Sequence, residues 1–159
     1  MLTLDGLPAH PLLVHLTVVA IPLAAILGII AVLWPRARAW MGLLPAGVAL
    51  VAVVMTPITT SAGEALIATK HHINPALAKH EHLGGQMIYW VAPLFVAIVL
   101  FWALTTNLEL IVRYRNPVPP VPVRLATYFF GVAIIVTAIG SIIWVYRIGH
   151  LGAESVWKY

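Results

Sequence analysis

The sequence predicts an all-α integral membrane protein, built as a bundle of four transmembrane helices. The chain has 159 residues, of which 62% are hydrophobic and only 9% are charged, whereas soluble domains carry about 25% charged residues. Its mean hydropathy is +0.98. Four apolar runs are each long enough to cross about 30 Å of hydrocarbon, which takes roughly 20 helical residues.

The four helices are expected near residues 11–34, 40–62, 75–104 and 123–148, within a single domain that covers residues 1–159. Asn74 followed by Pro75 is a typical helix start, because Asn caps the first turn and Pro fits its first position. The third helix is therefore expected to begin outside the bilayer. The first helix is not expected to be a cleaved signal peptide, since no basic segment precedes it and its apolar run exceeds the roughly 7–15 residues of such peptides.

The placement of the charges predicts how the bundle is oriented. The loops at 35–39 and 105–122, with the residue that flanks the second, lie on one side and carry five of the nine Lys and Arg residues against one acid, Glu109. The five are Arg36, Arg38, Arg113, Arg115 and Arg124. Cytoplasmic loops are enriched in Lys and Arg. We therefore expect an N-out, C-out, multi-pass membrane protein.

The composition also limits the chemistry. The chain has no cysteine, which excludes disulfides, thiolate metal sites, iron–sulfur ligation and covalently attached haem. Histidine and carboxylate side chains remain as metal ligands. Membrane lipids are expected partners, and nucleic acid is not, because no soluble face carries a basic patch. No nucleophile–base pair or phosphate-binding glycine loop is visible, so a carrier or binding protein is favoured over a stand-alone enzyme.

All seven histidines are predicted on the side opposite the arginine-bearing loops. His10 and His15 lie at the start of the first helix, His82 near the start of the third, and His150 just beyond the fourth. Ionisable residues at membrane helices are costly, so they indicate functional sites. His15 and His82 are the preferred candidates, because His71, His72 and His80 are expected to be solvated.

Two polar stripes indicate a pocket on the same side. One follows helical spacing on the second helix: Thr56, Thr59, Thr60 and Gly63, with Glu64 at its end. The other follows it on the third helix: His82, Gln86 and Tyr89. Lipid is a poor environment for such groups, so both stripes are expected to face the bundle interior. The predicted pocket is bounded by His15, Thr60, Glu64, His82 and Gln86.

A histidine-lined pocket in a cysteine-free membrane bundle favours haem b, since haem iron accepts axial imidazoles. His15 and His82 are the expected axial pair, with His10 and His150 as substitutes or a second pair. Arg147 or Lys79 is expected near the propionates. The protein would then exchange electrons with a quinone or an extracytoplasmic redox protein.

Two other interpretations stay open. Zinc or copper could be bound by three or four ligands drawn from His10, His15, His82, His150 and Glu64. Alternatively, the chain could be an accessory subunit of a larger membrane complex, or form a homo-oligomer, with histidines at a pH-sensitive interface.

The pattern resembles the small four-helix bacterial membrane proteins grouped as DUF2231. The matching segments are residues 6–15 (GLPAHPLLVH), 60–63 (TSAG), 81–84 (EHLG) and 149–153 (GHLGA). The resemblance implies a location in the bacterial inner (plasma) membrane, and the family name records no established activity. Members that look like this chain occur joined to Rieske-type iron–sulfur or cytochrome-like modules, which implies a role near electron transfer.

Overall fold

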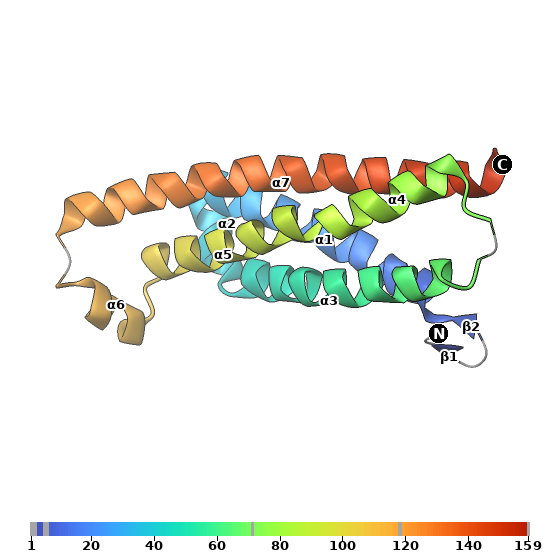
Figure 1. Ribbon diagram of the computed structural model, residues 1–159. Coiled ribbons are helices and arrows are strands. Elements are labelled where there is room, and N and C mark those ends of the chain that lie inside the picture. Colours follow the sequence, from blue (N-terminus) through green and yellow to red (C-terminus); the bar gives the residue numbers. More distant parts are fainter. Residues whose placement is uncertain (1–2, 5–6, 71, 118, 159) are drawn as a thin grey trace.

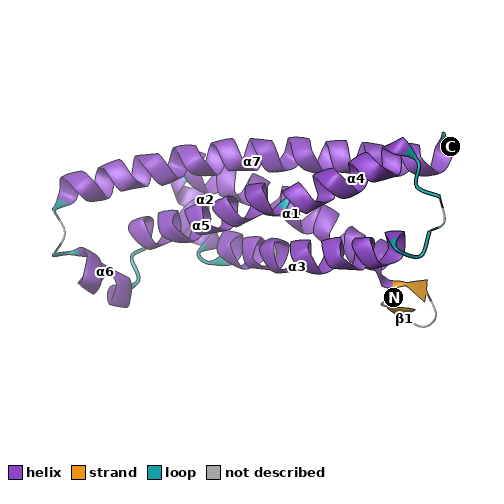
Figure 2. Ribbon diagram, viewed as in Figure 1, coloured by secondary structure: helices purple, strands orange, loops and turns teal. Residues whose placement is uncertain are grey.

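The computed structural model describes residues 3–4, 7–70, 72–117 and 119–158, and this part of the chain forms seven helices and one short hairpin of strands (Figures 1 and 2). The long helices are α1 (Ala9–Leu33), α3 (Leu44–Ile67), α5 (Ile88–Thr105) and α7 (Pro120–Trp157). The short helices are α2 (Pro35–Met41), α4 (Pro75–Gln86) and α6 (Glu109–Arg115). Strands β1 (Thr3–Leu4) and β2 (Leu7–Pro8) pair antiparallel.

Four stretches are long and apolar enough to cross a membrane: Ala9–Leu33, Leu44–Ile67, Pro75–Thr105 and Pro120–Trp157. Helix α1 packs against α3 and α7, and α5 packs against the same two helices, so the order around the bundle is α1, α3, α5, α7. Helix α4 lies along α7. Both chain ends lie at one end of the bundle, and α2 and α6 lie at the other (Figure 1). The predicted all-α, four-helix membrane architecture is thus confirmed.

Several predicted helix boundaries are wrong, and proline and glycine explain where. Pro35 begins a separate helix, α2, which ends at Gly42 with a φ of 53°. This left-handed conformation suits glycine, which has no Cβ. The second span therefore begins at Leu44 instead of 40 and continues to Ile67. The loop expected at 105–122 contains α6, and α7 begins inside it, at Pro120.

The third span is divided at Met87 into α4 and α5. Around this residue the backbone forms tighter hydrogen bonds, from Met87 N to Gly84 O (3.1 Å) and from Trp90 N to Met87 O (3.0 Å). Glycine pairs are a common cause of helix kinks, and Gly84 and Gly85 directly precede the break. The kink directs α4 toward α7. Asn74 caps α4 as predicted, accepting a hydrogen bond from Leu77 N.

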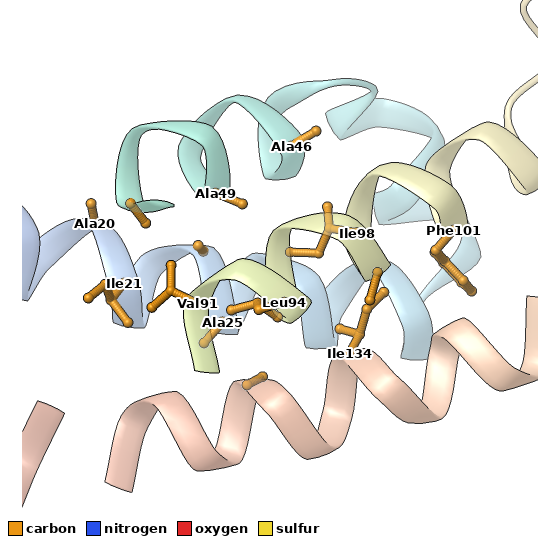
Figure 3. Packing of buried hydrophobic residues seen from close by; sticks show 14 of the residues in the cluster. Ala20, Ile21, Ala25, Ala46, Ala49, Val91, Leu94, Ile98, Phe101 and Ile134 are labelled. Atoms are coloured by element: carbon orange, nitrogen blue, oxygen red, sulfur yellow. The ribbon is translucent and has the colours of Figure 1, made fainter. Parts of the chain in front are cut away.

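Small residues hold the centre of the bundle together. Ala24, Ala25 and Ala52 are fully buried, and they let larger side chains such as Leu94 and Ile134 fill the space between helices (Figure 3). Apolar burial does not drive helices together in lipid, so close backbone approach and packing do. At Gly28 of α1, an added Cβ would come within 3.0 Å of Ile134 and 3.1 Å of Ile98.

We expect Gly28→Val to destabilise the bundle by about 1–3 kcal/mol, because the new side chain would overpack this contact. Gly47→Val in α3 is the matched control, since a Cβ there meets nothing within 4 Å. Thermal unfolding in detergent measures both. Equal melting temperatures for the two variants would contradict the proposed packing.

Candidate functional site

A cavity of about 170 Å³ lies at the end of the bundle that holds both chain ends, between α1, α3, α4 and α7. We call this end the histidine end. Apolar side chains form most of the walls, among them Val14, Val18, Ile21, Met87 and Val145. Glu64, Lys70 and Glu81 line the cavity and are exposed, which places its opening on the side where α3 and α4 diverge. The site is therefore apolar inside and charged at its mouth.

Two histidine side chains that line this cavity lie next to each other, edge to face. His10 lies on the first turn of α1, and His80 lies in the middle of α4. Both line the cavity and both are partly buried. Their ring centroids are 6.4 Å apart, and the ring planes are nearly perpendicular, at 87°. The two imidazoles thus come from different helices, α1 and α4.

Each imidazole is fixed by a hydrogen bond to a neighbouring helix. Nδ1 of His10 lies 2.9 Å from the carbonyl oxygen of Thr59 on α3. Nδ1 of His80 lies 2.8 Å from the carbonyl oxygen of Ile148 on α7. A carbonyl oxygen only accepts hydrogen bonds, so in both rings Nδ1 carries the hydrogen. In the neutral imidazole this leaves Nε2 as a free lone pair.

A glycine gives each ring the room it needs. A Cβ at Gly63 would lie 2.9 Å from Cε1 of His10, and a Cβ at Gly152 would lie 3.1 Å from Cε1 of His80. Each glycine comes four residues after the carbonyl that binds the ring. The same arrangement of a ring, a carbonyl and a glycine therefore occurs twice, once between α1 and α3 and once between α4 and α7. The sequence shows no matching repeat, since residues 59–63 (TTSAG) and 148–152 (IGHLG) share only the final glycine.

The polar face predicted on the second span lines the cavity. Thr56, Thr59 and Thr60 of α3 all lie along it. Two turns beyond His10 along α1, the hydroxyl oxygens of Thr17 and Thr59 are 2.7 Å apart in a buried hydrogen bond that links α1 to α3. Thr56 donates to the carbonyl oxygen of Ala52. These hydroxyls are satisfied within the protein, so the polar groups left available at the cavity are the two imidazoles and the charged side chains at its mouth.

The structure does not bring His15 and His82 together at this cavity. His15 is exposed, with Nδ1 2.6 Å from the carbonyl oxygen of Pro11 on its own helix. His82 is exposed and contacts Gln86, with 3.0 Å between Nε2 of each residue. Tyr89 is 74% exposed. The expectation that this stripe faces the interior is therefore wrong.

The rotation of α4 accounts for this difference. The residues of the third span that line the cavity are Leu77, His80, Glu81, Gly84 and Met87. They follow helical spacing along one face, adjacent to the predicted stripe. Of the five residues expected to bound the pocket, Thr60 and Glu64 line it, and His15, His82 and Gln86 do not.

His150 and Arg147 of α7 also lie outside the cavity lining. The ring of His150 stacks on Tyr146, and its Nε2 is 3.9 Å from Oε2 of Glu154. The guanidinium of Arg147 lies over the ring of Trp144, 5.0 Å from its centroid. The cation at the cavity is Lys70 instead of Arg147 or Lys79. Among the described residues, no three His, Asp or Glu side chains form a group that could hold a metal ion.

Sequence analysis missed His80 as a candidate. One signal was available, because the helix start at Asn74 and Pro75 places His80 on an ordered helix instead of in a loop. The second signal, a glycine on the partner helix, becomes visible only when α4 is seen beside α7.

The fold and the site together define a small four-span membrane protein with a paired-histidine cavity at one end. The family described as "Predicted membrane protein (DUF2231)" matches residues 6–159. The chain therefore belongs to the DUF2231 family. Comparison with curated proteins and with solved structures gives no match.

We expect Gly63→Ala and Gly152→Ala to displace the His10 and His80 rings from their carbonyl partners, because the added methyl group would collide with each ring. The cost should be about 1–3 kcal/mol in stability. ¹⁵N NMR of labelled histidine should show that the affected ring loses its fixed Nδ1–H form. Gly149→Ala is the control, since that glycine lines the cavity but has open space for a Cβ. Unchanged histidine signals in all three variants would argue against the glycine contact.

Proposed function

We propose that the protein binds haem b between His10 and His80 and acts as an electron carrier in the membrane. The observation that carries this proposal is the pair of neighbouring imidazoles from α1 and α4. Each has Nδ1 tied to a backbone carbonyl and Nε2 free, and the ring centroids are 6.4 Å apart.

The spacing of the two rings suits a metal held between them. Two imidazoles on opposite sides of one metal have ring centroids about 6 Å apart, because each metal–nitrogen bond is about 2 Å and the ring centre lies about 1 Å further. The described residues supply no third ligand in a group with these two. A cofactor that brings four nitrogen ligands of its own, as a porphyrin does, fits this donor set.

The surroundings also fit a porphyrin. The walls are mostly apolar, and glycines Gly84 and Gly149 leave space along them. A porphyrin is larger than the 170 Å³ cavity, so it must also occupy the open side between α3 and α4. Lys70 at this mouth is the side chain placed to meet a propionate.

When bound, haem supplies a one-electron redox couple. The chain's own part is to hold the imidazoles in one orientation, with Nδ1 as the hydrogen-bond donor and Nε2 as the ligand atom, and to exclude water with apolar side chains. A hydrogen bond from the second ring nitrogen to a carbonyl raises the basicity of a ligating imidazole. We propose a quinone or an extracytoplasmic redox protein as electron partner. In this proposal the histidine end faces outward from the bacterial inner membrane.

A second candidate is a zinc or copper site. The observation that favours it is Glu64, a carboxylate that lines the same cavity as the two histidines. Two imidazoles, one carboxylate and a water make a four-coordinate set that zinc accepts. In the structure the three side chains do not form a metal-holding group, so this candidate requires Glu64 to move inward.

The test is haem binding by purified wild-type protein and by four variants. Wild type should bind one haem per chain, with the reduced-minus-oxidised absorption bands of a six-coordinate b-type haem. His10→Ala and His80→Ala should each remove one axial ligand, lower haem affinity more than tenfold and convert the remaining haem to a five-coordinate form. His15→Ala and His82→Ala are the matched controls, because both rings are exposed outside the cavity.

Wild-type protein that stays colourless after haem reconstitution would overturn the proposal. Loss of haem in His15→Ala or His82→Ala, with full binding in His10→Ala and His80→Ala, would reassign the ligands. Stoichiometric zinc or copper by elemental analysis, without a Soret band, would favour the second candidate.

A further inference from the structure

The opposite end of the bundle carries an unbalanced positive charge. We call it the arginine end: it comprises α2, α6 and the first turns of α7 (Figure 1). It holds five arginines and one acid, Glu109. Both ion pairs found among the described residues involve Glu154, which lies at the histidine end. The arginines of the arginine end are thus not neutralised by carboxylates within the described chain.

Two of these arginines serve the fold. Arg38 donates to the carbonyl oxygen of Ala31 (3.1 Å), and its guanidinium lies over the ring of Phe101. Arg115 donates to the carbonyl oxygens of Leu104 (2.6 Å) and Thr106 (3.1 Å), which lie at the end of α5. Both side chains satisfy carbonyl groups that a helix end leaves without partners. Their guanidinium groups are therefore engaged in hydrogen bonds within the protein.

The other three arginines do not bind backbone carbonyls of the described residues. Arg36 on α2, Arg113 on α6 and Arg124 on α7 are exposed. None of them forms a side-chain hydrogen bond or ion pair with another residue in the part of the chain that the structure describes. Three separate segments thus each present one free guanidinium at the same end.

Exposed aromatic side chains accompany these arginines along the chain. They are Trp34 and Trp40 around α2, Tyr114 on α6, and Tyr128 one turn after Arg124, and each is more than 60% exposed. Trp and Tyr concentrate at the depth of lipid headgroups. Leu108 and Leu110 at α6 are also exposed, at 53% and 65%. This mixture of apolar, aromatic and cationic groups matches the headgroup region of a bilayer.

We propose that the arginine end binds the headgroups of anionic phospholipids through Arg36, Arg113 and Arg124. Guanidinium groups match phosphate oxygens in charge and in planar hydrogen-bonding geometry. The unpaired positive charge that complements anionic headgroups is concentrated at the arginine end. At the histidine end the cations are accompanied by the acids Glu64, Glu81 and Glu154, and Lys158 is paired with Glu154 at 3.0 Å. This inference does not depend on what the histidine cavity binds.

The experiment titrates purified protein in neutral detergent with phosphatidylglycerol, and in parallel with phosphatidylcholine, while the melting temperature is followed. Phosphatidylglycerol should raise the melting temperature in a saturable way that high salt weakens. Each arginine near an anionic surface strengthens binding about fivefold. The triple variant R36Q/R113Q/R124Q should therefore bind phosphatidylglycerol at least tenfold more weakly.

Two further variants separate lipid binding from folding. K79Q/R147Q removes two cations from the histidine end and should keep the full response to phosphatidylglycerol. R38Q should melt at a lower temperature in both lipids while it retains the phosphatidylglycerol-dependent increase. If the triple variant does not fold, the three single glutamine variants and the charge-conserving R36K/R113K/R124K replace it. Equal responses to both lipids, or an unchanged response of the arginine-to-glutamine variants, would overturn the proposal.

Discussion

The hydrogen bonds that tie His10 to the carbonyl of Thr59 and His80 to the carbonyl of Ile148 determine the character of the site. Each bond joins the beginning of one span to the helix beside it: α1 to α3, and α4 to α7. Each also fixes which ring nitrogen is protonated, so that Nε2 is left available. Gly63 and Gly152 leave room for both rings, because a Cβ at these positions would come within 2.9 Å and 3.1 Å of the Cε1 atoms of His10 and His80.

The sequence was sufficient to predict the spans, because a transmembrane helix needs a long apolar run and little else. It also predicted the cap at Asn74 and the polar face of α3, since both depend on spacing within one helix. The orientation of α4 was different. It depends on the kink at Met87 and on packing against α7, so the inward face carries His80 instead of His82. Rotation of one helix by part of a turn changes the candidate ligand, and local spacing does not determine that rotation.

The two ends of the bundle are built for different surroundings. At the histidine end, ionisable groups line a cavity, and both acidic and basic side chains are present. At the arginine end, α2 and α6 place aromatic and cationic side chains on the outside, while Arg38 and Arg115 hold the helix ends in place. This asymmetry is consistent with a protein that has one working face and one anchoring face.

The central claim is that one haem is held by two equivalent imidazoles, those of His10 and His80. Pulsed electron paramagnetic resonance of the oxidised, haem-loaded protein, with ¹⁵N-labelled histidine, counts the imidazole nitrogens bound to iron. The account predicts two axial histidine nitrogens with closely similar couplings, as expected for ligands held by the same carbonyl and glycine arrangement. An iron centre with one histidine nitrogen, or with none, would contradict it.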